Sequence, residues 1–117
     1  GISILIDVHG ASTDRRFDID IGTMKTKSLG GNSSLREDMK AIFQSQGIET
    51  ITYDVFPAER QNTITKHAYI KRGVQSLQLE INRKYRAHQT GKAFAQLMAG
   101  LTLAVQHLEN ERKAKRA

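Results

Sequence analysis

At residues 2–9 the sequence reads Ile-Ser-Ile-Leu-Ile-Asp-Val-His, and Gly10 follows directly. The even-numbered residues are all aliphatic, and this period of two predicts a β-strand. Leu5 makes the apolar run almost continuous, which is typical of an interior strand covered on both faces. Such a strand needs other elements on both sides of its sheet, so this stretch favours an α/β fold.

Two more strands and a helix are predicted on the carboxyl side of this stretch. Residues 17–21 and 48–56 alternate between apolar and polar positions and predict strands. Between them, Ser34 and Glu37 have the spacing of a capping box, and Gly47 is placed to end a helix. The apolar residues at helical spacing are Leu35, Met39, Ile42 and Phe43.

The second half of the chain adds a loop, a strand and a helix. Residues 57–73 are polar and long for a connection, which predicts a functional loop. Residues 74–82 fit the period of either a helix or a strand, and we adopt the strand. Residues 94–108 predict a long amphipathic helix. The element order predicts one α/β domain over residues 1–117, with a mixed or parallel sheet and flanking helices.

The composition narrows the classes of function. Hydrophobic residues make up 38% of the 117 residues and charged residues 26%, as in globular proteins. The chain has no cysteine, so any metal would be held by His, Asp or Glu. No apolar stretch is long enough to predict a membrane span, and the cytoplasm is the default location.

The net charge of +6 raises the question of nucleic-acid binding. Much of this charge lies in a basic tail from about residue 110, after the last periodic position. Basic residues at a helix end are favoured by the helix dipole and are usually solvated. No aromatic residue interleaves with them, as a base-stacking surface would require, so nucleic acid is not the expected partner.

Two segments carry candidate chemistry. His9 lies at the carboxyl end of the first predicted strand, where open α/β sheets place their ligands, and Asp7 shares its face. On the predicted strand 74–82, Glu80 and Asn82 project to one polar face. Each segment alone also fits a structural interpretation, namely a hydrogen-bonded strand-end histidine and a solvated edge strand.

Taken together, three stretches resemble the N-formylglutamate amidohydrolase family, a branch of the zinc carboxypeptidase-like hydrolases. They are Ile-Asp-Val-His-Gly at residues 6–10, Asp-Ile-Asp-Ile-Gly-Thr at 18–23 and Gln-Ser-Leu-Gln-Leu-Glu-Ile-Asn-Arg-Lys-Tyr at 75–85. The resemblance covers residues 4 to about 108, and the third stretch is its most specific part. It implies part of a phosphorylase/hydrolase-like domain, the carboxyl-terminal half of that fold.

The resemblance also implies roles for single residues. His9 would be a zinc ligand, with Asp7 orienting its ring, and Glu80 would be the catalytic carboxylate that activates water. The residues implied in holding a small acidic amide substrate, such as an N-acylated glutamate or a glutamyl peptide, are Asn82, Arg83, Arg60 and Thr63. The loop that holds Arg60 and Thr63 lacks the glycines of the family's substrate loop.

The remaining zinc ligands would precede the first strand in the family, so we expect these 117 residues alone to be inactive. Within the chain, His67 is the one further candidate ligand, because it lies in the predicted functional loop. We expect His88 and His107 to be surface residues. Two alternatives stay open: a non-catalytic basic α/β binding module, and a family member that kept the fold and lost the metal.

Overall fold

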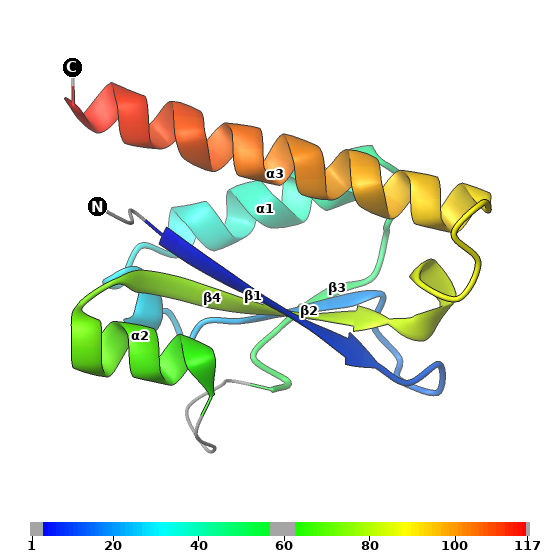
Figure 1. Cartoon of the computed structure of the whole chain (residues 1–117), viewed down its shortest axis with the longest axis horizontal. Helices are drawn as coiled ribbons and strands as arrows, with labels where there is room; N and C mark the ends of the chain where they lie inside the picture. The colour runs from blue at the N-terminus through cyan, green and yellow to red at the C-terminus, as the bar shows by residue number, and fades with distance from the viewer. Residues whose placement is uncertain (1–3, 57–62, 117) are drawn as a thin grey trace.

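The computed structural model describes residues 4–56 and 63–116 and has a four-stranded mixed sheet at its centre (Figure 1). The strand order is β1-β4-β2-β3. The central strand β4 pairs in parallel with β1 and antiparallel with β2, and β2 pairs in parallel with β3. The bounds of the strands are Ile4–Ala11 for β1, Ile19–Gly22 for β2, Ile51–Tyr53 for β3 and Gln75–Asn82 for β4. The predicted α/β class with a mixed sheet is therefore confirmed.

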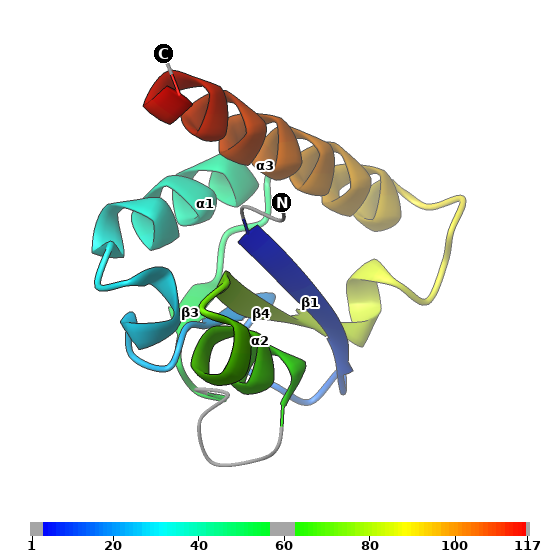
Figure 2. The ribbon, with the colours of Figure 1, turned by 60° about the vertical axis from the view of Figure 1, so that its left-hand side comes forward.

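The helices lie in two layers, one on each face of the sheet. Helices α1 (Ser33–Ser45) and α3 (Lys92–Arg116) cover one face, and α2 (Ile64–Arg72) covers the other, as Figures 1 and 2 show from two directions. Two short 3-10 turns, η1 (Lys27–Leu29) and η2 (Arg83–Tyr85), precede α1 and follow β4. None of the described helices is long and apolar enough to cross a membrane.

The hydrophobic core lies between the sheet and the α1–α3 layer. Alternate residues of β4 and β2 form the sheet side of the core, and residues of α1 and α3 pack against them. The two helices approach closely at Gly100, where a Cβ atom would lie 2.8 Å from the ring of Phe43. The largest fully buried aliphatic and aromatic side chains are Phe43, Ile19, Ile21, Leu29, Met39, Ile48, Leu77, Leu79 and Ile81.

Helix α1 begins earlier than the sequence predicts. Its N-cap residue is Asn32, and the predicted capping box at Ser34 and Glu37 is wrong. Ser34 lies inside the first turn, and its hydroxyl donates to the Asn32 side chain at 2.6 Å. The carboxyl end is as predicted, because Gly47 has a φ of 85° and Ile48 N donates to Phe43 O at 3.1 Å.

The stretch predicted as a loop at residues 57–73 contains helix α2. Thr63 is the N-cap and accepts a hydrogen bond from Lys66 N at 3.0 Å, and Gly73, with a φ of 65°, ends the helix. The helix was missed because its buried residues are only Thr65 and Ala68, so it has no apolar stripe. The predicted strand at 74–82 and the helix at 94–108 are present, and α3 extends through the basic tail to Arg116.

Candidate functional site

The sheet face beneath α2 carries a group of polar side chains from three adjacent strands. In the β1–β4 register Asp7 is opposite Gln78 and His9 is opposite Glu80, and in the β2–β4 register Asp20 is opposite Glu80. Residues directly opposite one another in neighbouring strands point to the same face of a sheet. We call these five residues the sheet-face cluster. Glu80 lies at its centre, between His9 and Asp20.

His9 and Asp7 are two residues apart on β1, so their side chains meet on one face. His9 Nε2 lies 2.7 Å from Asp7 Oδ2. An ionised carboxylate can only accept a hydrogen bond, so Nε2 is the donor and neutral His9 keeps its lone pair on Nδ1. The His9 side chain is 42% exposed, whereas Asp7 is buried. This is the arrangement by which a carboxylate orients a metal-binding imidazole.

The surroundings of Glu80 make its carboxyl group harder to ionise. Burial raises the pKa of Glu80, and a charged His9 lowers it. The carboxylates of Asp20 and Asp7 raise it further, while Arg15 lowers it, and the net shift is above the ordinary value. The lowering by His9 applies only to the protonated imidazole. A carboxyl group whose pKa is raised in this way is suited to taking and returning a proton.

Gln78 is the neighbour that contacts Glu80 along the same strand. Its Nε2 donates to Glu80 Oε1 at 3.2 Å. Gln78 is almost fully buried, and its Oε1 has no hydrogen-bond partner within the described part of the chain. A buried carbonyl oxygen without a partner is costly, so a donor beyond the described residues would be favoured there.

Asp20 was not singled out from the sequence, although the alternation in residues 17–21 places it on the polar face of β2. It is fully buried and accepts three hydrogen bonds. Thr52 Oγ1 donates to its Oδ1 at 2.7 Å, Val55 N donates to Oδ1 at 3.1 Å, and Phe56 N donates to Oδ2 at 2.9 Å. Asp20 thus fixes the end of β3 and adds negative charge beside Glu80.

Arg15 was also missed, because it lies in the turn between β1 and β2 and has no periodic signal. Its guanidinium carbon lies 4.7 Å from the centre of the Phe56 ring. Phe56 in turn makes an edge-on contact with Phe17, at 6.1 Å between ring centres. The charge of Arg15 lowers the pKa of Glu80, after the larger effect of His9.

A polar hollow of about 350 Å³ lies beside Arg15, between the β1–β2 turn and the end of β4. Lys84 and Asp18 line it and form an ion pair, with 2.6 Å between Nζ and Oδ1. Burial alone would raise the pKa of Asp18, but the hydrogen bonds from Lys84 and Thr50 outweigh it and leave that pKa lowered. Both carboxylate and cation are therefore charged at neutral pH.

The residues predicted to hold the substrate come from two parts of the chain, the end of β4 with η2 and the segment around the start of α2. Asn82 is buried; its Nδ2 donates to Phe17 O at 3.1 Å, and its Oδ1 accepts from Lys84 N at 3.0 Å. Arg83 is exposed in η2. Thr63 caps α2, and Arg60 lies outside the described residues. The structure brings Asp7, His9 and Glu80 together, whereas the hydrogen bonds of Asn82 go to Phe17 and Lys84.

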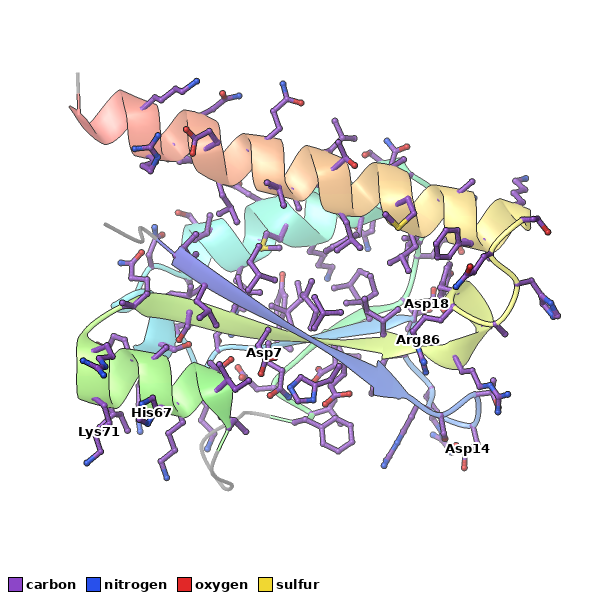
Figure 3. All side chains as sticks on the ribbon, viewed as in Figure 1. Asp7, Asp14, Asp18, His67, Lys71 and Arg86 are labelled. Carbon is purple, nitrogen blue, oxygen red and sulfur yellow. The ribbon has the colours of Figure 1, made fainter. Side chains whose placement is uncertain are left out.

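The other histidines lie away from the sheet-face cluster. His67 is exposed on α2, and Figure 3 shows it well separated from Asp7. His88 is exposed in the turn before α3. His107, expected at the surface, is half-buried between α3 and α1, beside Asp38. Among the described residues, three potential ligand atoms within 4.8 Å of one another occur only at Asp38, His107 and Glu111, so the sheet-face cluster has no complete ligand set there.

Comparisons with protein families, with curated proteins and with solved structures found no match to this chain. The resemblance to the N-formylglutamate amidohydrolases therefore rests on the three sequence stretches that carry it.

Proposed function

We propose that this chain supplies the His9 and Glu80 part of the active site of a metal-dependent hydrolase that cleaves an amide in a small acidic substrate. One observation carries the proposal. His9, whose ring is oriented by Asp7 at 2.7 Å, lies opposite Glu80 in the sheet register, and the pKa of Glu80 is raised. An oriented imidazole beside a carboxyl group of raised pKa is the pairing that metal-assisted hydrolysis uses.

The donor chemistry of the cluster fits zinc in part. Neutral imidazole is a good zinc ligand, and Asp7 serves as the outer carboxylate that holds the ring. A catalytic zinc needs three protein ligands and one open position, so His9 would require two partners beyond the described residues. When bound, zinc would polarise the amide carbonyl and lower the pKa of water to about 7.

The proton movements fall to Glu80. Its carboxylate would accept a proton from the attacking water as the water oxygen forms its bond to the amide carbon. Glu80 would then deliver that proton to the amide nitrogen as the carbon–nitrogen bond breaks. A raised pKa favours both steps, because a stronger base accepts the proton more readily and the acid form is populated for the return.

A cation near Glu80 would recognise the acidic group of the substrate. Arg15 joins Arg83 and Arg60 as a candidate, because its charge already acts on Glu80 and it lines the polar hollow. A guanidinium group can bind a carboxylate through two parallel hydrogen bonds, which fixes the orientation of the substrate. This supports an N-acylated glutamate or a glutamyl peptide as the substrate class.

The test compares two variants of the protein at its natural length, with N-formylglutamate as substrate and added zinc. Glu80→Gln keeps the shape of the side chain and removes the base, so turnover should fall by roughly a hundredfold to ten-thousandfold with zinc content nearly unchanged. His9→Ala should lower zinc content and turnover together. Glu37→Gln, an exposed position on α1, is the matched control and should leave both unchanged.

Two outcomes would overturn the proposal. Unchanged turnover in Glu80→Gln would remove Glu80 from the mechanism. A folded wild-type protein that takes up no zinc and hydrolyses nothing would favour the alternative, a family member that kept the fold and lost the metal.

A further inference from the structure

A second group of ligand-type side chains lies on the opposite side of the sheet, between α1 and α3. Asp38 comes from α1, and His107 and Glu111 come from α3. We call these three residues the interhelix cluster. Because the two helices cover the apolar face of the sheet and α2 covers the polar one, the interhelix cluster is separated from His9 and Glu80 by the sheet (Figure 1).

The two carboxylates of the interhelix cluster converge on one nitrogen atom. His107 Nε2 lies 3.1 Å from Asp38 Oδ2 and 3.7 Å from Glu111 Oε1. One N–H group has a single hydrogen to donate, so an ordinary ion pair leaves the second carboxylate without a good hydrogen bond at this nitrogen. The three ligand atoms lie within 4.8 Å of one another, which is close enough for them to surround one metal ion.

The separations also match the size of a zinc site. Zinc bonds to nitrogen and oxygen are about 2.0–2.1 Å, so neighbouring ligand atoms of a tetrahedral site lie roughly 3.3 Å apart. The two measured separations, 3.1 and 3.7 Å, lie on either side of that value. All three ligand atoms lie within 4.8 Å of one another, so small rotations of exposed carboxylates would complete the geometry.

The helices hold the ligands in place. His107 and Glu111 are one turn apart on α3, so their side chains lie on the same helix face. The opposing α1 is held close by the contact of Gly100 with the Phe43 ring. The side chains of His107, Asp38 and Glu111 are 30%, 47% and 50% exposed, which leaves a path for an ion and room for a water ligand.

The charge balance favours a divalent cation. With His107 neutral, Asp38 and Glu111 bring two negative charges, which one Zn²⁺ neutralises. The nearest basic residue along α3, Arg112, is engaged by Glu109, with its Nε 2.9 Å from the Glu109 carboxylate. Zinc accepts both imidazole nitrogen and carboxylate oxygen as ligands.

We propose that Asp38, His107 and Glu111 form a zinc site that braces α3 against α1, with water as the fourth ligand. Because its ligands come from both α1 and α3, such a site would lock the two helices together. The proposal does not depend on the proposed hydrolase activity.

The experiment uses the chain with His9→Ala, so that the sheet-face cluster cannot contribute a histidine. Titration calorimetry with zinc chloride should give one zinc bound per chain, and added zinc should raise the thermal unfolding temperature. Adding His107→Gln should weaken zinc binding by about a hundredfold or more and abolish the temperature shift, because loss of a direct ligand exceeds the 10–100-fold cost of losing an outer one. Adding His88→Gln, an exposed histidine outside the interhelix cluster, should change neither.

Circular dichroism checks that each variant is folded, and Glu111→Gln gives a second test if His107→Gln is not. Absence of zinc binding in the His9→Ala chain would overturn the proposal. Unchanged binding in a folded His107→Gln or Glu111→Gln chain would overturn it as well. Neither result bears on hydrolysis by Glu80, which is measured separately.

Discussion

Strand β4 presents opposite chemistry on its two faces. Toward α1 and α3 it presents Leu77, Leu79 and Ile81, which are fully or almost fully buried. Toward α2 it presents Gln78 and Glu80, and there the cover is a helix of nine residues that buries only Thr65 and Ala68. The apolar face is closed by two long helices and maintains the fold. On the polar face His9 and Glu80 stay partly exposed to solvent.

The largest effect on stability is expected on the apolar face. Phe43→Ala removes a fully buried ring that also packs against Gly100, so the free energy of unfolding should fall by about 3–5 kcal/mol. Urea unfolding followed by circular dichroism measures it. Val105→Ala on the exposed side of α3 is the control and should change stability by no more than about 0.5 kcal/mol. If both variants lost the same free energy of unfolding, burial of Phe43 on the apolar face would not be what stabilises the fold.

A smaller loss of unfolding free energy is expected when a buried polar group on the other face of the sheet is replaced. Asp20→Ala leaves Thr52, Val55 N and Phe56 N without their carboxylate acceptor, which should cost about 1–3 kcal/mol. Asp14→Ala, in the exposed β1–β2 turn, serves as the comparison in the same unfolding assay. If Asp20→Ala lowered the free energy of unfolding no more than Asp14→Ala, the hydrogen bonds of Asp20 would not stabilise the polar face.

The smallest expected effect is an increase in the free energy of unfolding, and its size depends on pH. The folded-state pKa of Glu80 lies above the ordinary value of 4.5, so the ionised carboxylate destabilises the folded state at neutral pH. Glu80→Gln should therefore be more stable than the wild type near pH 7. The gain should shrink as pH falls through the folded-state pKa and vanish below 4.5, where the wild type also carries the proton. A Glu80→Gln variant less stable than the wild type at neutral pH would show that the buried carboxylate does not destabilise the folded state.

Periodicity predicted most of the fold, because the strands and the two long helices each bury a regular apolar set. It also placed Asp7 with His9 and gave Glu80 a polar face. It failed at α2, where the signals were only the capping Thr63 and the terminal Gly73. It could not give the strand order, since the pairing of β1 with β4 joins segments far apart in the sequence.

The interhelix cluster could not be predicted from the sequence for the same reason. The spacing of His107 and Glu111 is visible on a helix, but Asp38 belongs to another element, and only tertiary packing brings it to the same nitrogen. Arg15 was hidden for a related reason, because a turn residue has no period and its position depends on how β2 pairs. Patterns within one element are readable from sequence, whereas contacts between elements require the fold.

The strand order also has a consequence for folding. β1 and β2 follow one another in the chain, but β4 lies between them in the sheet. They therefore do not pair directly as a β-hairpin. Each of them pairs with residues 75–82, far along the chain, and such non-local pairing slows folding. The pairing of β1 with β4 that places His9 opposite Glu80 is one of these non-local contacts. A chain stalled before insertion would retain helical content while lacking the proposed active site, and its open strands would be exposed to aggregation.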